Sequence, residues 1–433
     1  MGKNWRTLFI LVFLHMLIDG FIVYFFYSNS IFLFLRDLIP ALAFLFFMLQ
    51  EPFRDWLDRL GQELGIMVVF CMAIFFLVGI LEIYNPLSPG LTRGILGLKL
   101  LFIPWLVIPL SYAYFENIEV VEKFFKILAV YSIPINVIGL LQYVLGPGFM
   151  VSTFGSGFAH NTQMAMITGD YRGESFVRIF GTFASSALYG EFLVYIIIIG
   201  FVLLLSGSKP RWLWLLVIGE SLFCLLGTGS RGSLVSVVLM ILLFSRMLKR
   251  ARAMVVSGII FSVILFGAFN LLGPAVRARF EDARNVKIIR SRTVDTTSKM
   301  FFILLSKYPL GKGIGSASQA SRYLGKREGS FELVENYPCK LQMETGIVGV
   351  ILFYSMMIFL FIRWMVWKRE FYDDTKAYFF FCALSAYFAG SLIVGVFPDT
   401  APASFLFWSC LGMIPRLASF EMEERKKIEE LSE

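Results

Sequence analysis

Two short segments place an arginine beside a glycine-containing turn, an arrangement suited to binding an oxyanion or a phosphate. Arg178 begins an Arg-Ile-Phe-Gly-Thr-Phe sequence that ends at Phe183, just before an apolar segment. Arg231 lies in Thr228–Ser233, which joins two apolar segments with almost no loop. A helix N-terminus with a nearby guanidinium binds phosphate well, and a cation at membrane depth is costly. We expect both arginines to bind an anion. The simpler alternatives are an interfacial arginine and a topological marker.

A third group of residues lies further along the chain, between residues 290 and 315. Arg290 and Arg292 lead into an expected helix, which ends near Pro309. The glycines that follow, Gly311, Gly313 and Gly315, would let backbone N–H groups approach a ligand closely. This is not a Walker loop, because no Gly-Lys-Ser/Thr sequence follows. Taken alone, the glycines indicate a loop.

A carboxylate comes next, in a polar segment that leads into an apolar one. Glu335, followed by Asn336 and Tyr337, could act as a general base toward a hydroxyl if cations surround it. The alternative is a solvated acid. His160 is a second possible base, although a surface histidine is the simpler interpretation. The two histidines and five cysteines form no metal-ligand spacing, so we expect no metal and no cofactor.

The elements that must position these residues are membrane-spanning helices. The chain has 433 residues, of which 58% are hydrophobic and 16% charged, whereas soluble domains have about 25% charged residues. Its mean hydropathy is +0.74. This composition excludes an ordinary soluble enzyme, a disordered chain and a disulfide scaffold. We predict about twelve transmembrane helices, at residues 7–27, 31–50, 64–84, 93–114, 124–146, 186–206, 212–228, 233–249, 254–273, 346–367, 377–397 and 400–418.

The basic residues predict the orientation of these helices. An even number of spans places both termini on one side, and short loops on that side with both tails hold twenty Lys and Arg residues. Short loops on the other side hold four. The positive-inside rule therefore predicts cytoplasmic termini. It also predicts a short cytoplasmic tail at 419–433.

Two external segments are too long to be simple connectors. One runs over residues 146–185, between spans of the 1–273 region, and the other over 274–345, before the final spans at 346–418. The second has thirteen basic residues against seven acidic ones, so most of the net charge of +8 lies there. Long loops are exempt from the positive-inside rule. The surplus is either an indifferent surface or a site that attracts an anion.

Taken in order, these segments resemble the O-antigen ligase and O-antigen polymerase superfamily, over roughly residues 130–365. The resemblance rests on Arg178–Phe183, Thr228–Gly232, Pro309–Gly315 and Asn336 with Glu344–Gly349, and Gln142 also fits. The ligases carry a histidine directly before the asparagine, where this chain has Glu335. The Asn-Pro-Asn of many members is absent here, and Ser298 replaces a tryptophan. The missing histidine favours a polymerase.

The resemblance implies an all-helical, GT-C-like membrane glycosyltransferase in the plasma (inner) membrane of a bacterium. Such enzymes act at the outer face on glycans linked to undecaprenyl pyrophosphate, without a metal. The implied partners are a lipid-linked donor, a lipid-linked acceptor, membrane lipids and a chain-length regulator protein, but no nucleic acid. Arg178 and Arg231 would stabilise the pyrophosphate with Arg290 or Arg292, and Glu335 would act as the base. Gly311, Gly313, Gly315, Asn336 and Tyr337 would shape the sugar site, with His160 nearby.

Two other functions stay open at this stage. A ligase would move a finished glycan to a lipid A core or another acceptor. A transporter or flippase of lipid-linked oligosaccharides would use intramembrane acids such as Glu82 and Glu220 as a proton path. A transporter predicts an inverted repeat, and none is evident in the sequence.

Overall fold

The structure is a computed structural model in which almost every described residue is helical. It describes residues 4–16, 30–51, 53–154, 169–171, 174–176, 178–183, 185–248, 258, 262, 266–267, 296–317, 336–371, 375–394 and 403–432. A two-stranded antiparallel hairpin lies in the first long loop, where β1 (Gly169–Tyr171) pairs with β2 (Glu174–Phe176).

The helices follow the chain in the order that the apolar segments predict. In the first half they are α1 (Asn4–Met16), α3 (Ser30–Gln50), α4 (Phe53–Leu64), α5 (Ile66–Ile83), α6 (Leu91–Phe102), η1 (Ile103–Leu106), α7 (Val107–Tyr114) and α8 (Ile118–Phe154). In the second half they are α10 (Ser186–Leu205), α11 (Arg211–Gly227), α12 (Arg231–Met247), α16 (Thr296–Lys307), α18 (Tyr337–Trp367), η4 (Lys368–Glu370), α19 (Lys376–Val394) and α20 (Ala403–Ser432).

The prediction of a polytopic helical membrane protein is confirmed in its main point. Six helices of the described chain are long and apolar enough to cross a membrane, at Ile66–Ile83, Leu91–Tyr114, Ile118–Gly146, Ser186–Leu205, Tyr337–Trp367 and Lys376–Ile393. Helices α11 and α12 lie where spans were expected, with 17 residues each. Most of the expected span at 254–273 lies outside the described residues. The number twelve stays a prediction.

Glycines mark the ends of two spans at the positions that the hydropathy predicts. Gly146 (φ 69°) breaks α8 where the span 124–146 was expected to end, and Gly346 (φ 64°) breaks α18 where the span 346–367 was expected to begin. A side chain at a positive φ is strained, so glycine permits the change of direction. Residues 337–345 therefore form a separate helical segment ahead of the α18 span.

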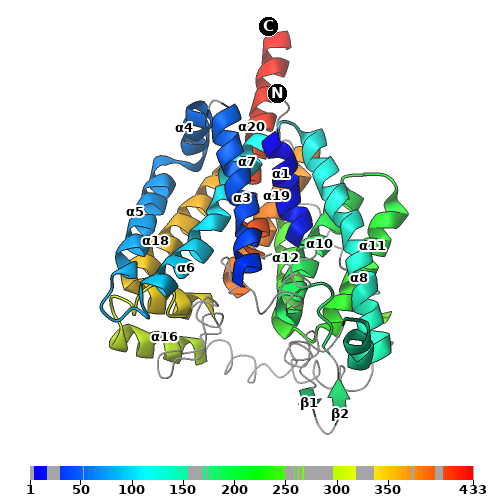
Figure 1. The fold of residues 1–433 in the computed structure, drawn as a ribbon. Helices are drawn as coiled ribbons and strands as arrows, with labels where there is room; N and C mark the ends of the chain where they lie inside the picture. The colour runs from blue at the N-terminus through cyan, green and yellow to red at the C-terminus, as the bar shows by residue number, and fades with distance from the viewer. Residues whose placement is uncertain are drawn as a thin grey trace.

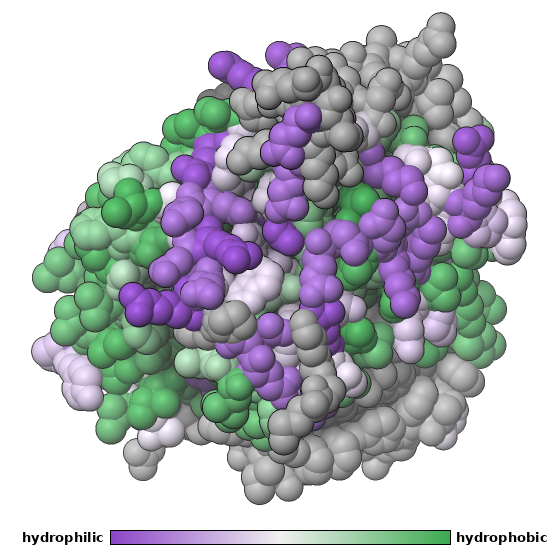
Figure 2. Space-filling model, turned by 90° about the horizontal axis from the view of Figure 1, so that it is seen from above, coloured by the Kyte–Doolittle hydropathy of each residue, from purple (hydrophilic) through white to green (hydrophobic). Residues whose placement is uncertain are grey.

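The two ends of the molecule differ in the parts of the chain that they carry. Figure 1 shows both termini at one end, the terminal face, whereas α16 and the β1–β2 hairpin lie at the opposite end, the loop face. The terminal face carries hydrophilic side chains, with hydrophobic residues around its flanks (Figure 2). Among its contacts, Glu122 accepts from Lys126 at 2.6 Å and from Lys376 at 2.8 Å, which links α8 to α19.

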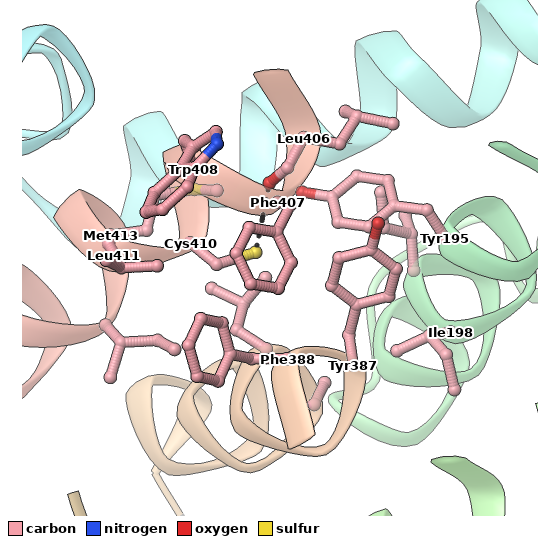
Figure 3. Close-up of a cluster of buried hydrophobic side chains, with 14 of the residues drawn as sticks. Tyr195, Ile198, Tyr387, Phe388, Leu406, Phe407, Trp408, Cys410, Leu411 and Met413 are labelled. Atoms are coloured by element: carbon pink, nitrogen blue, oxygen red, sulfur yellow. Dashed lines mark hydrogen bonds between the residues drawn. The ribbon is translucent and has the colours of Figure 1, made fainter. Parts of the chain in front are cut away.

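The core lies where α10, α19 and α20 meet. In both α10 and α19, 78% of the apolar segment is buried inside the protein. In α5 the share is 28%, so α5 lies at the periphery. The rings of Tyr195 and Tyr387 lie 4.8 Å apart, and those of Phe388 and Phe407 stack at 4.7 Å (Figure 3). Aromatic pairs at these separations stabilise helix contacts beyond their buried area.

Helix α4 was not expected, because the sequence analysis left residues 51–63 as a loop. It is amphipathic: Leu60 and Leu64 are buried, whereas its charged residues, apart from the half-buried Glu63, are exposed. Glu63 Oε1 accepts from the Tyr112 hydroxyl at 2.7 Å. Burial raises the pKa of Glu63 to about 7, against opposing effects from the Tyr112 hydrogen bond, Arg416 and Arg363.

This carboxyl gives a pH-dependent prediction. The folded pKa of Glu63 is about 7 and the ordinary value is 4.5, so the folded protein holds the proton more tightly. Stability associated with Glu63 is therefore present below pH 4.5 and lost as the pH rises through 7. Glu63→Gln, which mimics the neutral acid, should stabilise the protein at pH 8 by up to about 3 kcal/mol and hardly at pH 4.5.

Thermal unfolding in detergent at several pH values checks this prediction. Asp58→Asn is the matched control, because Asp58 is an exposed carboxylate of the same helix. A Glu63→Gln effect that does not change with pH would contradict it.

Candidate functional site

The Arg178–Phe183 segment forms a tight turn held by one buried side chain. Gln142 on α8 is fully buried, and its Oε1 accepts from the backbone N–H groups of Phe180 (3.0 Å) and Gly181 (2.9 Å). Its Nε2 donates to the Gly181 carbonyl at 2.7 Å. Gly181 has a φ of 57°, which glycine adopts without strain. Gln142 therefore satisfies three backbone groups that have no helical partner.

The same turn lies directly against the end of α11. Arg178 Nε donates to the Thr228 carbonyl at 2.8 Å, and the Ile179 N–H donates to the Gly227 carbonyl at 3.2 Å. A Cβ at Gly227 would lie 2.8 Å from the end of the Ile179 side chain, so the two segments pack closely. The structure thus brings together the two arginine-containing segments that the sequence analysis predicted to act together.

Arg231 is the first residue of α12. Ser230 caps this helix: its hydroxyl accepts from the Ser233 N–H at 3.4 Å and lies 2.8 Å from the Ser233 hydroxyl. Gly229 (φ 62°) provides the reversal between α11 and α12. The half-buried Arg231 therefore lies at a helix N-terminus, where the helix dipole adds to its positive charge. This end of α12 is suited to an anion.

The glycine turn, residues 311–315 after α16, packs on the bend at Gly346 in α18. Lys312 N–H donates to the Met343 carbonyl at 2.6 Å, and Ile347 N–H donates to the Pro309 carbonyl at 3.0 Å. A Cβ on Gly346 would lie 2.3 Å from the Leu310 carbonyl carbon. A Cβ on Gly311 would lie 2.8 Å from the Gly346 nitrogen. The two backbones can approach this closely because both positions are glycine.

On its other side, the glycine turn contacts the α5–α6 connection. A Cβ on Gly315 would lie 2.3 Å from the Arg93 carbonyl oxygen, and one on Gly313 would lie 2.8 Å from Ser88 Cβ. Asn85 Nδ2 donates to Glu82 Oε2 at 2.7 Å and to the Gly311 carbonyl at 3.4 Å. The space beside these glycines is thus filled by protein. Their expected part in sugar binding stays a prediction.

The beginning of α18 places Asn336 and Tyr337 differently. Asn336 occupies the N-cap position, and its carbonyl accepts from the Lys340 N–H at 3.0 Å. Tyr337 is 2% exposed and its ring packs 5.2 Å from that of Phe353, so it belongs to the core. Glu344 is also buried, and its Oε1 accepts from the Ala317 N–H at 3.1 Å. Asn336 is the more accessible of the two predicted sugar contacts.

Four predicted site residues, Glu335, Arg290, Arg292 and His160, lie outside the described residues. The others form two groups on the loop face: Arg178 and Arg231 around the ends of α11 and α12, and Gly311–Gly315 with Asn336 around α16 and α18. In Figure 1, α16 lies on the side of α5, α6 and α18, whereas α8, α11 and α12 lie on the other side of the molecule. Lys307 at the end of α16 and Lys312 in the glycine turn add positive charge to the second group. Their ammonium groups lie 5.2 and 5.6 Å from the centroid of the Tyr308 ring between them.

Two parts of this site were not predicted from the sequence. One is the contact of the glycine turn with α6, where a Cβ on Gly97 would lie 2.5 Å from the Gly315 nitrogen. The small residues Gly94 and Gly97, three positions apart, were its signal. The other is a buried polar cluster around Asn136 on α8, which also accounts for Glu220. Asn136 Nδ2 donates to Glu220 Oε1 at 3.2 Å, so this intramembrane acid has an amide partner.

The fold and these two groups define an integral membrane protein with functional candidates on its loop face. Residues 216–354, from α11 into α18, match the family model described as O-antigen ligase. The match includes Arg231, the glycine turn and Asn336, and it confirms the resemblance to the O-antigen ligase and polymerase superfamily. No curated protein matches the chain. Among the described residues, no cluster of His, Cys, Asp or Glu could hold a metal ion.

The glycine turn gives a prediction of stability. Gly346→Ala places a side chain at a φ of 64° and against the Leu310 carbonyl, which should cost about 2 kcal/mol of unfolding free energy or more. Gly219→Ala on α11 is the control, because no atom lies within 4 Å of its Cβ position. Thermal unfolding in detergent measures both. An unchanged unfolding temperature for Gly346→Ala would show that the turn does not require glycine there.

Proposed function

We propose that the protein is a polysaccharide polymerase that works at the outer face of the plasma membrane. It transfers a growing glycan from undecaprenyl pyrophosphate to the terminal sugar of a lipid-linked repeat unit. The observation that carries this proposal is the pairing of the Arg178 turn with the end of α11, beside Arg231 at the start of α12. The family match supports a ligase or polymerase type of function.

The chemistry that we assign follows from the groups at the loop face. The bond between the anomeric carbon and the pyrophosphate oxygen breaks, and the acceptor hydroxyl forms the new glycosidic bond. Negative charge grows on the leaving pyrophosphate, and Arg178 and Arg231 stabilise it, because guanidinium groups match phosphate geometry. Glu335 takes the hydroxyl proton. The pyrophosphate already activates the sugar, so no nucleotide is consumed.

The orientation of the protein follows from the same proposal. The termini and their basic loops lie in the cytoplasm, and the loop face is external, where lipid-linked glycans are joined. The polymerase is favoured over the ligase because Glu335 stands where the ligases carry a histidine. A transporter has no use for two arginine-bearing turns gathered at one face.

The first test measures turnover of a synthetic lipid-linked repeat by purified protein in detergent or nanodiscs. Arg178→Ala and Arg231→Ala should each lower kcat by about a hundredfold or more, as does the loss of one charge-stabilising donor at an active site. Arg246→Ala is the control, because Arg246 is an exposed residue in the last turn of the same helix α12. If both variants match the wild-type rate, the proposed function is wrong.

The products of the same reaction separate the polymerase from the ligase. A polymerase yields a ladder of lipid-linked chains that differ by one repeat. A ligase yields one transfer to a second carrier and no ladder. Gel analysis of products made with the repeat alone, and with an added lipid A core acceptor, decides between them.

A further inference from the structure

A chain of buried polar side chains lies beneath the Arg178 turn, inside the membrane-spanning helices. Asn136 on α8 and Tyr189 on α10 are both fully buried. The Tyr189 hydroxyl donates to Asn136 Oδ1 at 2.8 Å. Because Oδ1 accepts from a hydroxyl, the amide nitrogen of Asn136 must face the other way.

The amide nitrogen faces α11. Asn136 Nδ2 donates to Ser221 Oγ at 3.0 Å and to Glu220 Oε1 at 3.2 Å. One amide group thus joins three helices and uses both of its ends. Hydrogen bonds between transmembrane helices fix the rotation of each helix more narrowly than apolar contacts do.

The other end of this chain reaches the turn itself. A Cβ on Gly181 would lie 3.1 Å from the Tyr189 ring, so the ring supports the turn from below. The ring also stacks on that of Phe183, with centroids 5.4 Å apart. Gln142 holds the same turn by three hydrogen bonds. Tyr189 therefore contacts the turn through its ring and Asn136 through its hydroxyl.

We infer that Asn136 and Tyr189 are positioning residues that hold the Arg178 turn in register with the end of α11. The inference rests on the proposed function, in which Arg178 stabilises the pyrophosphate. Neither residue touches the substrate. Their hydrogen bonds fix the place of the guanidinium, and a displacement of about 1 Å at a charge-stabilising group lowers the rate strongly.

Tyr189→Phe tests this most cleanly, because it removes the hydroxyl and keeps the ring under Gly181. Asn136→Leu keeps the branched heavy-atom skeleton of asparagine and removes both polar ends of the amide. The matched control is Tyr195→Phe: Tyr195 lies on the same helix, is equally buried, and its ring packs on Tyr387 of α19. Its ring lies in the aromatic core beside Tyr387 (Figure 3).

Turnover of the synthetic lipid-linked repeat should separate the variants. Tyr189→Phe and Asn136→Leu should lower kcat about tenfold with little change in KM, whereas Tyr195→Phe should match the wild type. In an Arg178→Ala background, Tyr189→Phe should lower kcat by less than about twofold, because the guanidinium that it positions is gone. A general loss of packing would instead lower the rate equally in both backgrounds.

The outcomes are distinguishable. If Arg178→Ala and Arg231→Ala both turn over at the wild-type rate, the proposed function fails. If only Arg178→Ala does so, the function stands and the inference is overturned, because Tyr189 and Asn136 act through Arg178. If Arg178→Ala loses activity and Tyr189→Phe behaves like Tyr195→Phe, the function stands and the inference is overturned. A full effect of Tyr189→Phe in the Arg178→Ala background also overturns it. Should Asn136→Leu fail to fold, Tyr189→Phe decides alone.

Discussion

Non-helical backbone at the edge of a membrane must find its hydrogen-bond partners within the protein, and this constraint organises the loop face. Two turns meet it in different ways. The Arg178 turn is satisfied by the Gln142 side chain, which accepts twice and donates once, and by the Gly227 carbonyl, which accepts from Ile179. The glycine turn is satisfied by backbone carbonyls of α18 and α5, which it can reach because three of its five residues are glycine. Each turn is thereby fixed to a rigid helix.

The sequence predicted what depends on local composition. Apolar segments of about twenty residues gave the order of the helices, and span ends expected at 146 and 346 fall on glycines that break α8 and α18. Helix α4 was not predicted, because a surface helix with twelve residues and five charges has no long apolar segment. Twelve spans stay a prediction: six described helices are long and apolar enough to cross a membrane, and most of the expected span at 254–273 lies outside the described residues.

For the candidate site, the residue types were informative and their contacts were not. The arginine and glycine motifs could be recognised in the sequence. The two arginine motifs are in contact, because Arg178 donates to the Thr228 carbonyl. The glycines of residues 311–315 were expected to approach a ligand, but the nearest atoms belong to Arg93, Ser88 and Gly346. A glycine signals close approach without saying what approaches it. Likewise, Glu220 was considered as part of a proton path in a transporter, and it accepts from the Asn136 amide.

The polar contacts of Asn136 have a consequence for how the protein is made. Helices α8 and α11 each carry a group, Asn136 and Glu220, that is costly to expose to lipid on its own. Once the helices meet, each group becomes the other's partner and Tyr189 joins α10 to them. These helices are therefore better inserted into the bilayer as a set than one after another. Assembly of the arginine-bearing side of the protein then begins during synthesis, before α18 and the glycine turn exist.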